Sequence, residues 1–355
     1  MLDHKKRLEK LRKALKSHEL DSMLVTNAVN RTYMSGFSGT NGFALITPEN
    51  AFLLTDFRYI EAAIKEAPNF EIIDYGLSME KCLHGILMKA GINSLGFESE
   101  HISYAGFHRL SETLSNISLT PSKGLIENLR KIKEKDEMEA IQYACKVSDE
   151  ALAYIMDIVK TGMTEKQVAL ELEYFVKKNG AEMFPKFIVA SGYRAALPHG
   201  YFSDKEIKNG EFLMIDFGAQ YQGYYSDITR TFVIGQADEK QKEIYDIVFR
   251  AQKNAVDKAR PGISYLDQFE SATCIMEKAG YQLGHGLGHG VGLDIHELPR
   301  INNIANGIVE ENMVFTIEPG IYISDWGGVR IEDTVAITSD GCQPLTHFSK
   351  ELMII

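Results

Sequence analysis

The chain of 355 residues is longer than most single domains, and its length predicts two of them. Its composition, with 45% hydrophobic and 25% charged residues, is typical of a globular protein and argues against extensive disorder. The formal net charge of −11 argues against a protein that binds nucleic acid or an anionic membrane, because both need a basic surface.

The opening of the chain predicts a surface helix, since Leu8, Leu11 and Leu15 recur at helical spacing among lysines and arginines. Short apolar runs then alternate with helical patterns, which predicts an α/β domain over residues 1–125. The runs expected as strands lie within residues 21–27, 42–56 and 94–99, and the helical patterns lie within residues 58–67 and 79–91.

The remainder of the chain, residues 126–355, predicts a second domain of a different kind. Helices are expected at residues 137–159, 164–179 and 239–259, and strands are expected within residues 212–220, 228–235, 313–323 and 329–338. Strand pairs of hairpin type mixed with helices favour an α+β domain built on a curved antiparallel sheet.

The cysteines and the opening residues bear on the compartment. The four cysteines stand far apart without a CxxC pair, which indicates reduced thiols rather than a disulfide framework. The first residues are charged throughout and lack the apolar stretch of a signal peptide, and no run is apolar enough to cross a bilayer. These features predict a soluble, cytoplasmic protein with neither a membrane nor a nucleic acid as partner.

One segment near the C-terminal end, "GHGLGHGVGLDIHELPR" at residues 284–300, combines three histidines with five glycines. A helix is disfavoured there, because each internal glycine costs about 1 kcal/mol relative to alanine. The rings of His285, His289 and His296 could reach a common centre. The segment therefore indicates a metal or catalytic site if suitable partners exist elsewhere, and otherwise a glycine loop with incidental histidines.

Four carboxylates interrupt the apolar strands expected in the second domain. They are Asp216 in "FLMID", Asp227 before "ITRTFVI", Glu318 in "VFTIEPG" and Glu332 in "VRIEDTVAI". A carboxylate inside a hydrophobic strand is unfavourable unless it is paired or binds a cation. A single acid of this kind would indicate a salt bridge, whereas four on consecutive strand segments indicate a common site.

Hairpin geometry predicts how these acids meet. A turn near Gln222-Gly223 would bring Asp216 roughly opposite Asp227 on one face, and the turn containing "DWGG" would do the same for Glu318 and Glu332. So many acids around one histidine need positive charge, which a pair of divalent cations would supply. Oxygen ligands with one imidazole favour Mn²⁺, with Co²⁺ or Zn²⁺ as alternatives.

The order of these residues, with "HGLGHGVG", "HELP", "TIEPG" and "VRIEDT" around the later members, closely resembles the "pita-bread" metallopeptidases of family M24. Within that family it resembles the proline-specific branch, which contains prolidases (Xaa-Pro dipeptidases) and aminopeptidase P. The resemblance covers the whole chain, since "YMSGFSGTNGFALIT" and "LLTDFRY" look like the additional domain of this branch. It implies a creatinase-like N-terminal domain at residues 1–125 and a pita-bread catalytic domain at residues 126–355.

The resemblance also implies a role for each site residue. As metal ligands it implies Asp216 on one ion, His289 on the other, Glu318 on one of them, and Asp227 and Glu332 as bridges. As catalytic residues it implies His199, His296 and Glu318, and as substrate contacts it implies His285, Arg300 and Arg330. Two cations about 3.5–4 Å apart can share a water molecule and lower its pKa enough to give hydroxide near neutral pH.

The activity implied is hydrolysis of the peptide bond before proline in an Xaa-Pro dipeptide. The alternative is an aminopeptidase P that acts on longer Xaa-Pro-Xaa peptides. A methionine aminopeptidase shares the ligand order but generally lacks the additional N-terminal domain, and a non-catalytic pita-bread binding protein would typically have lost ligands. Relatives also imply a homodimer.

Overall fold

The computed structural model describes residues 4–355. The chain divides into two compact units, Met1–Arg130 and Lys131–Ile355. Within the described part of the chain, none of the helices combines the length and the apolar character that crossing a bilayer requires.

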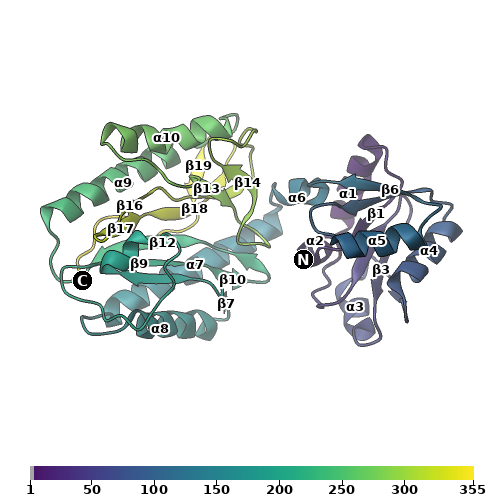
Figure 1. Cartoon of the computed structure of the whole chain (residues 1–355), viewed down its shortest axis with the longest axis horizontal. Helices are drawn as coiled ribbons and strands as arrows, with labels where there is room; N and C mark the ends of the chain where they lie inside the picture. Colours follow the sequence, from purple (N-terminus) through teal and green to yellow (C-terminus); the bar gives the residue numbers. More distant parts are fainter. Residues whose placement is uncertain (1–3) are drawn as a thin grey trace. The chain divides into compact units, whose positions relative to one another are not determined.

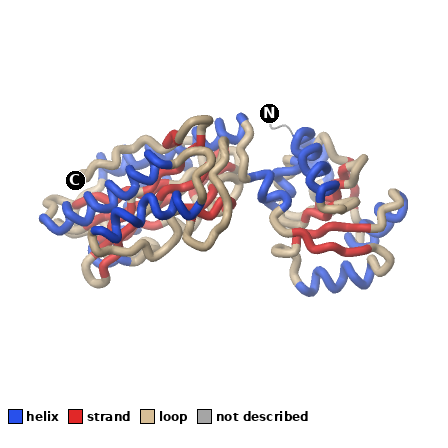
Figure 2. Tube along the Cα trace, turned by 90° about the horizontal axis from the view of Figure 1, so that it is seen from above, coloured by secondary structure: helices blue, strands red, loops and turns tan. Residues whose placement is uncertain are grey.

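The N-terminal unit is built on a six-stranded mixed sheet in the order β4-β3-β2-β1-β5-β6. Its strands are β1 (Met23–Val25), β2 (Phe43–Ile46), β3 (Ala51–Thr55), β4 (Glu71–Asp74), β5 (Ser94–Glu98) and β6 (Ser118–Ser122). Its helices are α1 (His4–Ser17), α2 (Ala28–Ser35), α3 (Ile60–Glu66), α4 (Met79–Lys89), α5 (Tyr104–Thr113) and α6 (Leu125–Arg130). Figure 2 shows helices on both sides of these strands, which confirms the predicted α/β class.

The second unit contains four long helices and a large sheet. Its helices are α7 (Lys135–Ile158), α8 (Glu165–Lys178), α9 (Glu239–Lys258) and α10 (Tyr265–Lys278), with a 3₁₀ turn, η1, at Gly192–Ala196. The strands up to residue 233 are β7 (Glu182–Met183), β8 (Ile188–Ser191), β9 (Phe212–Phe217), β10 (Ala219–Tyr221), β11 (Tyr224–Tyr225) and β12 (Ile228–Val233). Those after residue 287 are β13 (Gly288–Gly290), β14 (Glu297–Ile301), β15 (Val314–Ile317), β16 (Gly320–Ile323), β17 (Gly327–Arg330), β18 (Glu332–Ile337) and β19 (Cys342–Pro344).

The main sheet of this unit runs in the order β14-β13-β15-β18-β12-β9-β8, and β19 pairs with β18. All of its strand pairs are antiparallel. In Figure 1 the strands of this unit lie between α9 and α10 on one side and α7 and α8 on the other. The predicted α+β domain with an antiparallel sheet is confirmed.

Two of the predicted strands are each divided in two. The expected strand at 313–323 becomes β15 and β16, and the break falls at Glu318-Pro319, because proline has no N–H to donate to a sheet. The strand expected at 329–338 likewise becomes β17 and β18. The hairpin β16–β17 forms a separate two-stranded sheet, so Glu318 lies at the end of β15 rather than inside a continuous strand.

Alternation along β9 shows how the sheet separates its two faces. Leu213 and Ile215 are buried in the apolar cluster formed with α7 and α8. Met214 belongs to the other large cluster of this unit. Since successive side chains of a strand point to opposite faces, Asp216 shares the face of Met214 and points away from α7 and α8.

The second unit is built from two similar halves. Helix α8 begins at Glu165 and α10 begins at Tyr265, and each follows a turn of the same kind. The Glu165 amide donates to the Lys205 carbonyl at 3.0 Å, and the Tyr265 amide donates to the Gly307 carbonyl at 3.1 Å. Glu165 and Tyr265 therefore occupy equivalent positions in the two halves.

Candidate metal centre

Strand register places three of the predicted acids on one face of the main sheet. Thr229 in β12 pairs with Asp216 of β9 on one side and with Glu332 of β18 on the other. Residues paired across antiparallel strands point to the same face. Asp227 lies two residues before Thr229 and so shares this face as well.

The predicted placement of Asp216 roughly opposite Asp227 is wrong by two residues. The turn lies where it was expected, with Gln222 (φ 50°) and Gly223 (φ 85°) in left-handed conformations that suit a two-residue hairpin. Residues equidistant from such a turn are paired, so Asp216 pairs with Thr229 and Asp227 lies diagonally from it. The shared face is preserved because the offset is an even number of residues.

The other two acids meet as predicted. Strands β15 and β18 pair Ile317 with Asp333, and the next position in this register sets Glu318 opposite Glu332. The hydroxyl of Thr316 donates to Oε1 of Glu318 at 3.1 Å, which fixes the carboxylate at the end of its strand.

His289 reaches the same face from β13. This strand pairs with β15 through Gly290 and Phe315 and with β14 on its other side. A side chain at position 290 would place its Cβ only 2.1 Å from the carbonyl oxygen of Leu298, so glycine there permits the close approach of β14. The glycine next to His289 thus serves backbone packing around the histidine.

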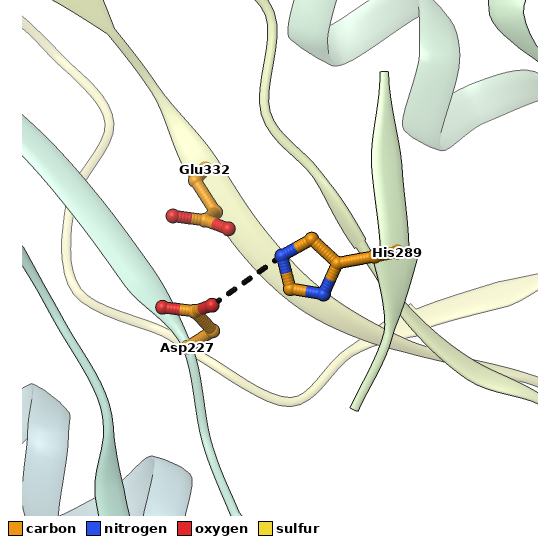
Figure 3. A group of neighbouring side chains, drawn as sticks. All are labelled: Asp227, His289 and Glu332. Atoms are coloured by element: carbon orange, nitrogen blue, oxygen red, sulfur yellow. Dashed lines mark ion pairs between the residues drawn. The ribbon is translucent and has the colours of Figure 1, made fainter. Parts of the chain in front are cut away.

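Asp227, His289 and Glu332 form the most compact group of possible ligands. One ligand atom from each lies within 4.8 Å of the others, and Figure 3 shows the side chains of His289 in β13, Glu332 in β18 and Asp227 just before β12 pointing toward one another. Nε2 of His289 is 3.6 Å from Oδ2 of Asp227 and 3.4 Å from Oε1 of Glu318. The structure therefore brings Glu318 beside the group, whereas the Asp216 carboxylate is bound to Arg330.

Burial and mutual repulsion govern the charges of this cluster. Burial raises the pKa of both Asp227 and Glu332 well above the ordinary values, and the neighbouring carboxylates raise them further. Burial likewise raises the pKa of Glu318 to about 7. The pKa of His289 is lowered to about 3 by burial and by the adjacent His296, so its ring is neutral and able to donate a lone pair.

The donor chemistry fits divalent cations. Four carboxylates and one neutral imidazole face each other, and in residues 4–355 the protein cation paired with these acids is Arg330, through Asp216. Carboxylate-rich sites with one imidazole suit hard or borderline divalent ions, and such ions would relieve the repulsion that raises the carboxylate pKa values.

Arg330 links the acids to a residue that the sequence interpretation missed. Its guanidinium pairs with Asp216, donates to the Tyr322 hydroxyl at 2.7 Å and donates to Oγ1 of Thr229 at 3.1 Å. The Tyr322 hydroxyl lies 3.0 Å from Nε2 of His285. Two predicted substrate residues, Arg330 and His285, are thus joined through Tyr322.

Threonine hydroxyls support the acids and were also missed. Thr229 donates to Oε2 of Glu332 at 2.5 Å, and Thr334 donates to the Asp227 carbonyl at 2.7 Å. Thr229 lies two residues after Asp227, and Thr334 lies two after Glu332. Polar residues spaced two apart in an apolar strand are therefore a signal in the sequence that could have identified them.

His199, His296 and Arg300 lie at the exposed rim of the site. The His296 ring packs edge-on against His289 with ring centroids 4.1 Å apart. Partial burial lowers the pKa of His296, and the nearby positive charge of Arg300 lowers it further. The proximity of His199 also lowers the pKa of His285 and the pKa of His296. The structure therefore brings His199, His285 and His296 together, as predicted for residues of one site.

A buried ion pair anchors the loop that carries His296. Nζ of Lys133 is 2.7 Å from Oε1 of Glu297, and the two side chains are 1% and 5% exposed. The other carboxylate oxygen of Glu297 accepts from the Asp294 amide at 3.4 Å. Glu297 therefore ties the His296 loop to the first residues of the second unit.

The fold and the site together are those of a metallopeptidase. Residues 139–339 match the model of metallopeptidase family M24, and residues 7–132 match that of the creatinase/prolidase N-terminal domain. The chain belongs to metallopeptidase family M24, with the pita-bread fold in its second unit.

Several characterised or solved relatives align along almost the whole chain. An Xaa-Pro dipeptidase of Pyrococcus horikoshii is 41% identical over 98% of this chain and 98% of its own length. The structure of an Xaa-Pro dipeptidase from Bacillus anthracis is 39% identical, with a TM-score of 0.97 over 99% of this chain and 100% of the other. That of an X-Pro aminopeptidase from Thermotoga maritima is 34% identical, with a TM-score of 0.91 over 98% and 99%.

Proposed function

We propose that this protein is an Xaa-Pro dipeptidase that works with two divalent metal ions, with Mn²⁺ as the first choice and Co²⁺ or Zn²⁺ as alternatives. The observation that carries the proposal is the cluster of Asp216, Asp227, His289, Glu318 and Glu332 on one face of the sheet. The names of the Pyrococcus and Bacillus relatives support the choice of substrate.

The ligand roles follow the arrangement of the strands. We assign Asp227 and Glu332 as bridges between the ions, because Asp227 directly precedes β12, Glu332 begins the adjacent strand β18, and both approach His289. Ions held there would supply Lewis acidity and lower the pKa of a water molecule so that it can attack a carbonyl carbon. Asp216 would exchange its contact with Arg330 for a metal, which frees the guanidinium for the substrate.

The residues at the rim would bind and orient the peptide. His296 and His199 would donate hydrogen bonds to the carbonyl oxygen as negative charge develops on it. Glu318, at the end of β15, would carry a proton to the proline nitrogen as it leaves. His285 and Arg330, joined through Tyr322, would line the substrate pocket.

Arg300 would select dipeptides over longer peptides. In an Xaa-Pro dipeptide the free carboxylate lies directly on the proline, and a guanidinium offers it two parallel hydrogen bonds. Arg300 lies opposite His289 in the β13–β14 register and is exposed, so its guanidinium is accessible to such a carboxylate.

The second candidate is an aminopeptidase P that cleaves longer Xaa-Pro-Xaa peptides, which the Thermotoga X-Pro aminopeptidase structure favours. One assay separates the two. Metal-loaded protein is given an Xaa-Pro dipeptide and the matching Xaa-Pro-Xaa tripeptide, and the proposal requires the larger kcat/KM on the dipeptide. A larger value on the tripeptide would assign the protein to the alternative. The homodimer and the cytoplasmic location remain predictions.

A further inference from the structure

Glu165, the first residue of α8, is a buried carboxylate held by a set of hydrogen bonds. Its residue is 0% exposed. Oε1 accepts from the amide of Ser191 at 2.7 Å and from its hydroxyl at 3.0 Å. Oε2 accepts from Nε of Arg194 at 3.0 Å, from the amide of Ser203 at 3.0 Å and from its hydroxyl at 2.7 Å.

These donors come from the two ends of one loop. Ser191 closes β8, Arg194 lies in η1, and Ser203 comes after the exposed tip that carries His199. Arg194 also donates to the Tyr201 carbonyl at 2.5 Å. A single carboxylate therefore clamps both stems of the loop 191–203, and the histidine lies between them.

The half of the second unit that contains α10 shows that the fold does not require an acid at the position of Glu165. The equivalent residue of α10 is Tyr265, which is 6% exposed and belongs to an apolar cluster. Its ring packs so closely on Gly307 that a Cβ there would lie 2.4 Å away. An aromatic ring thus fills the equivalent position by packing, whereas Glu165 satisfies hydrogen-bond donors.

A buried carboxylate is costly to desolvate, and five donors offset that cost only in one arrangement of the loop. We propose that Glu165 is a positioning residue, which holds the loop 191–203 so that His199 meets the substrate. The proposal rests on the role of His199 in the proposed dipeptidase activity. Glu165 itself does not touch the site.

The central test is Glu165→Gln, which keeps the shape of the side chain but points an NH₂ group at one set of donors. The matched control is Thr164→Ala. It removes the Thr164 cap from the Gln167 amide of the same helix and leaves the loop contacts intact. Hydrogen exchange of the peptide covering residues 191–203 and kcat/KM on an Xaa-Pro dipeptide are measured for both variants.

Glu165→Gln should speed exchange in this peptide and lower kcat/KM by about tenfold or more, as expected when a contact group is misplaced. Two metal ions per chain should remain, and Thr164→Ala should change neither quantity appreciably. Adding Glu165→Gln to His199→Ala should cause no further loss, because both changes remove the same contact. An additive loss, or effects in Glu165→Gln no larger than in the control, would overturn the proposal.

Arg194→Met gives a second route if Glu165→Gln fails to fold. It removes one of the five donors to the carboxylate, together with the hydrogen bond to the Tyr201 carbonyl, at the partly exposed edge of the clamp. It should shift exchange and kcat/KM in the same direction but less, because the four serine donors remain. No shift in either would count against the clamp. If wild-type protein leaves the dipeptide uncut, the proposed function fails, and hydrogen exchange alone decides whether Glu165 holds the loop.

Discussion

Two neighbouring acids in β18, Glu332 and Asp333, are equally buried but belong to different electrostatic environments. They are 1% and 0% exposed and point to opposite faces of the sheet. Asp333 is paired with Arg230 at 2.7 Å and Lys350 at 2.5 Å, and it accepts further hydrogen bonds from Gln252 and Thr346. Glu332 accepts from the Thr229 hydroxyl and lies beside the neutral His289 ring and three other carboxylates, whose repulsion Arg330 only partly offsets.

The difference appears in the two pKa values. Burial raises the pKa of Glu332, and repulsion from Asp227 adds to it. Burial acts on Asp333 in the same direction, but Arg230 and Lys350 outweigh it and lower the pKa of that carboxyl. Burial alone therefore does not mark a metal site. What marks it is a group of buried acids that outnumber the cations beside them, since four carboxylates here share Arg330.

The largest effect is expected on the face of Glu332. Chelation should abolish peptidase activity, and added Mn²⁺ or Co²⁺ should restore it. Glu332→Gln and Asp227→Asn should each lower kcat/KM by at least about a thousandfold, a modest part of the ~10⁶-fold or greater acceleration typical of enzymes. Elemental analysis should find fewer than two ions per chain. Retention of both ions in either variant would show that the bridging assignment is wrong.

Asp333→Asn should instead act on stability. It leaves the buried Arg230 guanidinium without its counter-charge, so the free energy of unfolding should fall by about 3–5 kcal/mol. Urea denaturation of the metal-loaded protein measures this change. The matched control is Lys350→Met, which removes a cation that is itself partly exposed and should therefore cost less. A loss of metal with unchanged stability would reverse the comparison between the two faces.

In metal-free protein, the acids on the two faces of the sheet should make the folding stability depend on pH in opposite directions. The pKa of Glu318 is about 7 in the folded state against 4.5 ordinarily, so its contribution to stability is complete below 4.5 and is lost as pH rises through about 7. Asp333, whose pKa is lowered, contributes above about 3.8 and loses that contribution in acid.

Thermal unfolding of the chelated protein should therefore show stability falling by on the order of 1–3 kcal/mol between about pH 5 and pH 8. Glu318→Gln should reduce this slope, and the part that remains is expected from Asp227 and Glu332, whose pKa values are also raised. Metal-loaded protein should not show it, because bound cations stabilise the ionised carboxylates. A chelated protein that becomes more stable over this range would contradict the charge assignment of the cluster.

The smallest effect is expected for Arg300, a cation on the metal-binding face of the sheet. In residues 4–355 the Arg300 guanidinium has no ion-pair partner, whereas Arg230 on the other face is fully engaged. Arg300→Ala should lower kcat/KM for an Xaa-Pro dipeptide by about ten- to a hundredfold, equivalent to about 1.5–3 kcal/mol for a hydrogen bond to a charged group. Hydrolysis of the Xaa-Pro-Xaa tripeptide should change far less, and equal losses on both would assign Arg300 to structure.

The period of two along strands explains what the sequence could predict. Acids in apolar strands stand out, and alternation combined with a hairpin turn is enough to put Asp216 and Asp227 on one face. That Glu332 shares this face follows from the pairing of β12 with β18, which only the fold shows. The pairing of Asp216 with Thr229 depends on counting from a turn whose position must be known to the residue. An error of two residues there leaves the face unchanged but misplaces the neighbours.

Residues in loops have no such period. His199 was identified only through the resemblance to a family, because nothing in its local pattern places it near the strands. His296 stood out in the glycine- and histidine-rich segment, but its catalytic role likewise came from the resemblance. The role of Glu165 is still harder to recognise from the sequence, because acidic residues are common in the first turn of any helix. Its donors lie 26 to 38 residues further along the chain, and only the fold brings them to it.

The Lys133–Glu297 ion pair limits where the second unit can be separated from the N-terminal unit or recombined with another one. Residues 139–339 match the peptidase family, but Lys133 precedes them and immediately follows the N-terminal unit. A fragment that begins at residue 139 would remove the Lys133 ammonium from the buried Glu297 carboxylate, next to His296. Any recombination that exchanges N-terminal units must therefore join the chains before Lys133, which makes the short connection between the units part of the enzyme's working framework.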